Sequence, residues 1–123
     1  MKEIFTVQEV FDLIGEEYLN QKILYGRKNY ILIDGYKVRC GSLRYMTFFQ
    51  KGIQCVCCGR KGAYFKLEPD SNNPERKHFN LYSDDGVLMT KDHIIPKSLG
   101  GKDCIDNMQT MCIKCNENKG DTI

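Results

Sequence analysis

No stretch of the sequence approaches the roughly 18 apolar residues that a membrane-spanning helix needs. The first residues hold one lysine followed by acidic side chains and no long apolar core, so no secretory leader is expected. Histidine is scarce, with two residues, so few positions can supply an imidazole base. A chain of 123 residues, 41% hydrophobic and 28% charged, is expected to fold as one soluble unit with a small appendage. We therefore expect a cytosolic protein with reduced thiols and no membrane contact.

Charge is unevenly distributed, although the formal net charge is only +2. Residues 1–21 carry one lysine against five acidic residues, whereas residues 22–51 carry seven lysines and arginines against Asp34 alone. Two interpretations are equally favoured: a polyanionic partner near the middle of the chain, or an ordinary solvated basic face.

Seven cysteines are an unusually high number for a reducing compartment, where clustered thiols generally indicate a metal site or catalysis. Four of them form two Cys-x-x-Cys pairs, Cys55 with Cys58 and Cys112 with Cys115. Two such pairs supply the four thiolates of a tetrahedral structural zinc site. The sequence therefore predicts a zinc site with four cysteine ligands.

The first pair has an alternative, because Cys57 could replace Cys55 or Cys58 as a ligand. We prefer Cys55 and Cys58 because Gly59, directly after them, tolerates the positive φ that a tight turn requires. The remaining thiols, Cys40, Cys57 and Cys104, are then expected to be small buried or idle side chains.

The N-terminal part of the chain, residues 1–51, is expected to hold two helices separated by a β-hairpin. Thr6 and Glu9 form a capping box, and apolar residues at helical spacing extend the first helix over about residues 7–22. A second helix is expected over residues 43–51, between Ser42 as its N-cap and Gly52.

The hairpin is predicted by Asp34-Gly35 between two β-rich runs. In its register, four apolar or aromatic side chains share the buried side: Ile31, Ile33, Tyr36 and Val38. Tyr30, Leu32, Lys37 and Arg39 share the other side. Aromatic and basic side chains together suit a phosphate backbone and also suit any half-exposed sheet. We hypothesise that Lys37, Arg39 and Arg44 contact nucleic acid.

Two proline residues mark residues 67–77 as an expected exposed loop. Residues 78–82 and 87–92 are expected to be short strands that form a second hairpin around residues 83–86. At the C-terminal end, a strand over residues 107–112 is expected to enter a helix over residues 113–119 that ends at Gly120.

A polar constellation surrounds the second cysteine pair. It consists of Asp92-His93, then Pro96 and Gly100-Gly101, then Asn107, then Cys112-x-x-Cys115-Asn116-x-x-Lys119-Gly120. His93 is the natural base for deprotonating water. Asp92 and Asn116 offer oxygen ligands suited to Mg²⁺ or Mn²⁺. Over about residues 52–123 this pattern resembles the HNH endonuclease family.

The resemblance implies an α+β fold in which a C-terminal ββα-metal motif, stabilised by the zinc site, follows the helix and hairpin module. It divides the chain into residues 1–51 and a nuclease domain of residues 52–123. It also implies that His93 is the general base, Asp92 and Asn116 bind Mg²⁺ or Mn²⁺, and Asn107 orients the imidazole. Asn116 stands where the family name has its final histidine, which favours an oxygen-ligated Mg²⁺ site.

The implied activity is hydrolysis of DNA phosphodiesters with one metal ion, leaving 5′-phosphate and 3′-hydroxyl ends. Lys97 and Lys119 are expected to contact phosphate, no organic cofactor is expected, and a phage or mobile-element source is suggested. The alternative is a non-catalytic zinc ribbon that binds nucleic acid or protein, which would not need a base beside oxygen ligands. A Cys-x-x-Cys redox protein is disfavoured because neither pair opens a thioredoxin-like βαβ unit.

Overall fold

The structure is a computed structural model that describes residues 2–21 and 30–123. Its larger sheet has five strands in the order β1-β4-β5-β3-β2: β1 (Ile4–Thr6), β2 (Tyr30–Ile33), β3 (Tyr36–Arg39), β4 (Gly62–Asp70) and β5 (Asn73–Ser83). The smaller sheet pairs β6 (Met89–His93) with β7 (Met108–Cys112). All pairings are antiparallel except a short parallel contact between β3 and β5. The α+β fold class is thus as predicted.

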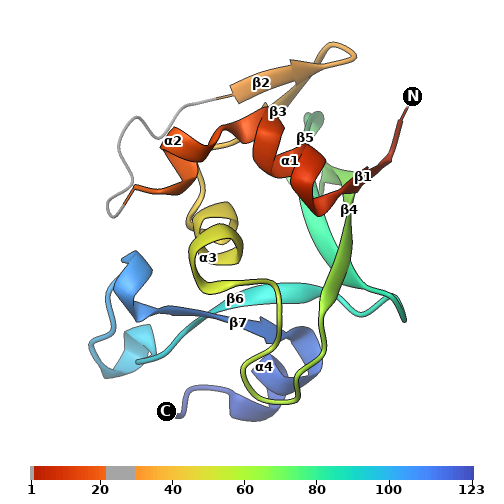
Figure 1. Cartoon of the computed structure of the whole chain (residues 1–123). Coiled ribbons are helices and arrows are strands. Elements are labelled where there is room, and N and C mark those ends of the chain that lie inside the picture. The colour runs from red at the N-terminus through yellow and green to blue at the C-terminus, as the bar shows by residue number, and fades with distance from the viewer. Residues whose placement is uncertain (1, 22–29) are drawn as a thin grey trace.

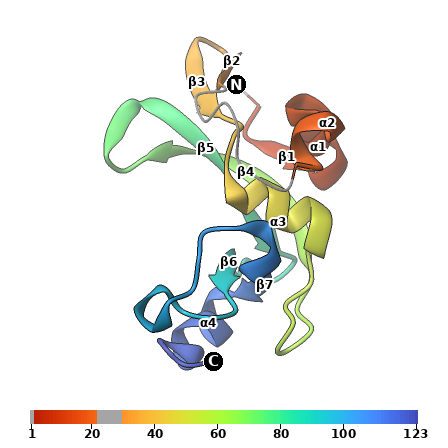
Figure 2. The ribbon, with the colours of Figure 1, turned by 90° about the vertical axis from the view of Figure 1, so that its left-hand side faces the viewer.

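Helices connect and cover these sheets (Figure 1). They are α1 (Val7–Ile14), α2 (Glu16–Leu19), α3 (Leu43–Lys51) and α4 (Ile113–Lys119), with 3-10 turns η1 (Lys97–Leu99) and η2 (Ile105–Asn107). Figures 1 and 2 show α3 at the centre, between the larger sheet and the β6–β7 pair. None of the helices in the described ranges is long and apolar enough to cross a membrane.

One apolar core joins the two ends of the chain. It contains the fully buried Phe48 of α3, Phe65 of β4 and Phe79 of β5, and continues to Met111 and Cys112 of β7. Burying each large apolar side chain stabilises the fold by roughly 1.5–3 kcal/mol. Because this core contains residues of α3 and of both sheets, its burial holds the two sheets together. The larger sheet takes strands from both sides of residue 51, so the expected boundary there does not separate two cores.

Several local predictions are confirmed. Thr6 and Glu9 form the capping box, and the β2–β3 hairpin has the predicted register, with Ile33 opposite Tyr36. The helix over residues 43–51 and the strand-to-helix passage into α4 are also as predicted. The first helix, however, breaks at Gly15, whose φ of 99° is incompatible with a continuous helix. The expected end of that helix at residue 22 lies outside the described residues.

Two predictions were wrong. Residues 67–77 are not a loop but the distal half of the long β4–β5 hairpin. Pro69 is tolerated because β1 pairs only with residues 64–66, which leaves this end of β4 at the sheet edge, where no N–H is needed. Residues 83–87 do turn, but β6 then pairs with β7, and only a single bridge joins Tyr82 to Leu88.

Candidate functional site

The four predicted zinc ligands gather in one cluster. One sulfur each from Cys55, Cys58, Cys112 and Cys115 lies within 4.8 Å of the others. The Sγ atoms of Cys58 and Cys112 are 3.8 Å apart, close to the separation of about 3.8 Å that a tetrahedral site with Zn–S bonds near 2.3 Å requires. The cluster can therefore hold a metal ion such as zinc, which would link the turn after α3 to the start of α4.

Backbone donors favour the thiolate form of the first sulfur of each pair, Cys55 and Cys112. The N–H groups of Cys58 and Cys115 each point at the first sulfur of their own pair, at 3.5 Å. Burial raises the pKa of the Cys55 thiol, but backbone N–H groups of Cys58, Cys112 and Cys57 outweigh this effect and lower it to about 6. The thiolate is the form that binds a metal ion.

The three remaining thiols lie outside this cluster. Cys57 and the cluster member Cys58 are both exposed, but only the sulfur of Cys58 belongs to the cluster. Cys40 is buried, and burial raises the pKa of its thiol to about 11. Cys104 is half-buried. The choice of Cys55 and Cys58 over Cys57 agrees with this arrangement.

Three of the four predicted catalytic residues meet at a pocket of about 280 Å³ between the end of β6, η1 and α4, and Asn107 does not line it. Asp92, His93 and Asn116 all line it. Asp92 is 7% exposed, and its Oδ2 accepts from Gln109 Nε2 at 2.9 Å and pairs with Lys119 Nζ at 3.1 Å. The β6–β7 register places Gln109 directly opposite Asp92. The carboxylate is therefore held rigidly in a nearly dry position.

Asn116 lies on α4, one helical position after Cys115. Its Nδ2 donates to Thr90 Oγ1 at 2.8 Å, and Thr90 in turn donates to the carbonyl of Met111 at 2.8 Å. This pair of hydrogen bonds fixes which way the Asn116 amide points, so that its oxygen is the atom available to a cation. The cysteine cluster anchors the first turn of the same helix.

A carboxylate that the sequence did not single out contacts the candidate base. His93 Nε2 lies 2.6 Å from Asp103 Oδ1, while the other carboxylate oxygen accepts from Lys97 Nζ at 3.0 Å. The hydrogen bonds from His93 and then Lys97 lower the pKa of Asp103 to about 2. Asp103 is therefore ionised at every pH at which an imidazole acts as a base. A proton held on Nε2 leaves Nδ1 as an acceptor.

Asn107 supports the loop rather than the imidazole. Its Oδ1 accepts from the N–H of Ile95, and its Nδ2 donates to the carbonyls of Ile95 and Lys102. Its own carbonyl accepts from the N–H of Ile94. These bonds hold the segment after His93 against the segment that carries Asp103. Asn107 thus acts on His93 through the chain and through Asp103.

Gly101, the second glycine of the motif, has a steric role in the same loop. A Cβ built on Gly101 would lie 1.6 Å from the carbonyl oxygen of Ile95, and the N–H of Gly101 donates to the carbonyl of Pro96. Only glycine permits this crossing of the two segments. After this crossing the chain approaches His93 again at Asp103, ten residues later in the sequence.

The predicted nucleic-acid contacts divide into two groups. Lys37 and Arg39 are exposed on β3, whereas Arg44 donates to the Phe79 carbonyl and to Asn80 Oδ1. Lys97 is exposed beside Asp103, but Lys119 is mostly buried, and its ammonium group is held by Asp92 and the His93 carbonyl. Lys22, Arg27 and Lys28 of the basic stretch lie outside the described residues.

Positive charge also continues along β6. Lys91, two residues before His93, is half-buried. Burial lowers the pKa of Lys91, and the like charges of Arg44 and Lys97 lower it further, while Asp103 opposes them. Arg44 of α3 is therefore electrostatically coupled to the edge of the candidate site.

Sequence reasoning missed three contacts: those of Asp103, Gln109 and the Lys119–Asp92 pair. Gln109 could have been found, because pairing the strands around His93 and residue 108 places it opposite Asp92. Lys119 is one turn after Asn116, so its position on the same face of the helix could also have been predicted. The sequence spacing does not show whether Asp103 or Asp106 approaches His93, because the folded shape of the loop decides this.

Comparison with known proteins agrees with this geometry. Residues 83–123, about the last third of the chain, match the family model described as HNH endonuclease. The match supports the predicted assignment to the HNH endonuclease family and includes Asp92, His93, Asn107 and Asn116. It excludes Cys55 and Cys58, which the fold alone brings to the second cysteine pair. No curated protein and no solved structure matches the chain.

Proposed function

We propose that this protein is a metal-dependent endonuclease that hydrolyses phosphodiester bonds in DNA. The observation that carries this proposal is the convergence of His93, Asp92 and Asn116 on one pocket, with the imidazole held by a carboxylate. A zinc ribbon that only binds nucleic acid has no use for a base with a fixed tautomer beside two oxygen ligands.

The residues of the pocket fit a small cation that prefers oxygen ligands. Asp92 Oδ2 already contacts Lys119 and Gln109, so Asp92 Oδ1 and Asn116 Oδ1 remain as the oxygen atoms that can bind a metal ion. Mg²⁺ is commonly held by one or two protein oxygens together with waters and substrate phosphate. When bound, such an ion supplies positive charge to the phosphate and to the leaving oxygen.

The chain's own groups supply the rest of the chemistry. His93 Nδ1 takes a proton from the water whose oxygen forms the new bond to phosphorus. The bond from phosphorus to the 3′-oxygen breaks, and that oxygen is protonated by solvent, which leaves 5′-phosphate and 3′-hydroxyl ends. Asp103 keeps the other proton on Nε2 and stabilises the imidazolium that forms. Lys97 and Lys91 add positive charge beside the pocket.

The test is cleavage of supercoiled plasmid DNA with added Mg²⁺ or Mn²⁺. Wild type should nick or linearise the plasmid, and His93→Ala should be slower by about 10²- to 10⁴-fold. Asn116→Ala should also lose activity, whereas Asn118→Ala, an exposed change on the same helix, should not. Circular dichroism and zinc content show whether each variant is folded. Equal cleavage by wild type and a folded His93→Ala would refute the proposal, and binding without cleavage would favour the zinc ribbon.

A further inference from the structure

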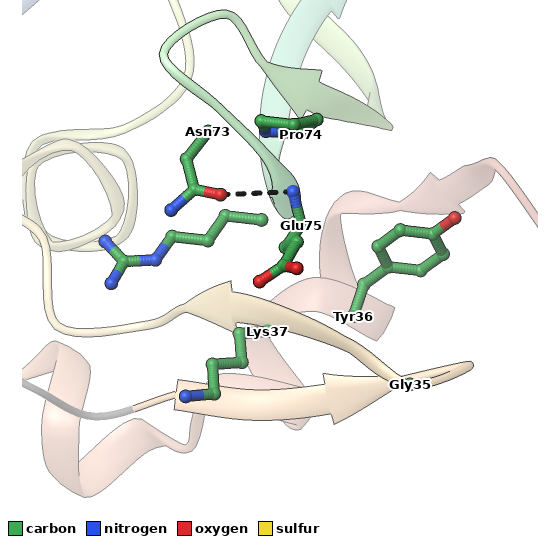
Figure 3. A pocket seen from close by; sticks show the side chains of 7 residues that line it. Gly35, Tyr36, Lys37, Asn73, Pro74 and Glu75 are labelled. Carbon is green, nitrogen blue, oxygen red and sulfur yellow. Dashed lines mark hydrogen bonds between the residues drawn. The ribbon is translucent and has the colours of Figure 1, made fainter.

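A basic cleft lies away from the candidate catalytic pocket, where the β2–β3 hairpin meets β5 and α3 begins. Three arginines from three elements line it: Arg39 of β3, Arg44 of α3 and Arg76 of β5. Its volume is about 180 Å³, and a wider pocket of about 530 Å³ adjoins it through Arg76. Figure 3 shows this wider pocket between Lys37 on the hairpin and Asn73 and Glu75 at the tip of the β4–β5 hairpin.

The charges in this cleft are not balanced within the protein. The parallel register of β3 and β5 places Lys37 directly opposite Arg76, and like charges in this position destabilise a sheet. Within residues 2–21 and 30–123, neither these two nor Arg39 and Arg44 form an ion pair with a carboxylate. Asp70 and Glu75 contribute to the lining without pairing with them. An external anion would relieve this repulsion.

The cationic groups are also held in place. The Arg76 guanidinium lies over the Tyr30 ring, at 5.3 Å from its centroid. Arg44 is fixed by the Phe79 carbonyl at 3.3 Å and Asn80 Oδ1 at 3.0 Å, two neutral acceptors that leave its charge intact. A guanidinium held over an aromatic ring can still donate N–H groups to a phosphate and loses little further freedom on binding.

The position of the cleft connects it to the catalytic pocket. Arg44 is at the start of α3, which packs against β6, and β6 carries Lys91 and ends with His93. Cations therefore extend from Arg39 and Arg76 through Arg44 and Lys91 to Lys97. Phosphates repeat at regular intervals along a nucleic acid, so one strand can meet successive members of such a series.

We propose that this cleft, with Arg39, Arg44 and Arg76, and the wider pocket beside it, with Lys37, bind the phosphate backbone of the double-stranded DNA substrate outside the site of cleavage. The proposal rests on the endonuclease function proposed above and adds how the N-terminal strands hold the substrate. Contacts to the backbone alone carry no sequence information, so the cleft contributes affinity and register rather than base specificity.

The test measures binding of short duplexes to the full-length zinc protein carrying His93→Ala, without added Mg²⁺, across a salt series. The cleft variant combines Lys37→Gln, Arg39→Gln and Arg76→Gln, and it spares Arg44 because that side chain supports β5. The slope of log affinity against log salt should become shallower by about 2.7, or about 0.9 for each phosphate contact. Between 50 and 200 mM salt, the His93→Ala protein with an intact cleft should then lose about 40-fold more affinity than the cleft variant.

The matched control removes the same charge elsewhere, with Lys51→Gln, Lys61→Gln and Lys114→Gln, all exposed outside the cleft. An equal change of slope in this control, or no change in the cleft variant, would overturn the proposal. In a series of longer duplexes, the wild-type background should gain affinity with length and the cleft variant should gain less. If the protein binds in this way but cuts no DNA, the endonuclease proposal fails alone, whereas cutting with equal slopes refutes only the cleft.

Discussion

Replacing Asp103 with asparagine tests whether a carboxylate, rather than the loop alone, prepares His93. The structure places Asp103 Oδ1 2.6 Å from His93 Nε2, which selects the tautomer with its proton on Nε2. An asparagine side chain can present an oxygen to the same proton, but it can also present its NH2 group and so accommodate the other tautomer. The variant therefore changes the tautomer balance and the charge with almost no change in shape.

The magnitudes separate a catalytic effect from a structural one. The Asp103 side chain is 52% exposed, and ion pairs at such exposure contribute little to folding because solvent screens them. Removing the hydrogen-bond partner of a metal-ligating histidine costs about 10- to 100-fold in metal affinity or activity, and we expect a loss of the same order for an imidazole that acts as a base. We therefore expect Asp103→Asn to unfold at nearly the wild-type denaturant concentration and to lower kcat by about 10- to 100-fold, with little change in KM.

Two measurements test this expectation. Imidazole ¹⁵N chemical shifts of the protein supplied with zinc, without Mg²⁺ or DNA, report which ring nitrogen carries the proton. They should indicate Nε2–H in wild type and a mixture in the variant. Plasmid cleavage rates give kcat and KM. Asp106→Asn, an exposed change three residues later, should alter neither. A wild-type ring protonated mainly on Nδ1, or unchanged kcat in Asp103→Asn, would refute the reasoning.

The remaining predictions concern the cysteine cluster and the buried ion pair. Because a zinc site with four cysteine ligands contributes about 10 kcal/mol to folding, Cys58→Ser or Cys112→Ser should unfold the C-terminal part, whereas the exposed Cys57→Ser should not. Elemental analysis should find about one zinc per chain, and mild EDTA should stop cleavage before circular dichroism changes; unchanged spectra in both serine variants would contradict the ligand set. Lys119→Met should lower the free energy of unfolding by about 3 kcal/mol, because Asp92 would remain buried with one partner fewer. Urea denaturation measures this loss, and a similar loss in Lys114→Met would show that it does not depend on the ion pair.

The sequence predicted those parts of the fold that depend on neighbouring residues. The capping box, the Asp34-Gly35 hairpin and the cysteine turns each involve residues within a few positions of one another, so their geometry follows from local chemistry. The β4–β5 hairpin was missed because prolines generally mark loops, and only the short reach of β1 makes Pro69 harmless. The partner of β6 was missed because a local turn after β5 indicated the wrong strand.

The same contrast between local and long-range contacts applies to the candidate site. Asp92, His93 and Asn116 could be predicted because a strand end and a helix face fix them locally, and the cysteine pair holds that helix beside the strand. Asp103 could not, because its position depends on a loop that Asn107 and Gly101 close through backbone contacts. The motif residues Asn107 and Gly101 therefore act by bringing a non-motif carboxylate to His93. It follows that a chain with the motif intact but without an acidic residue at this point of the loop would hold its imidazole less firmly.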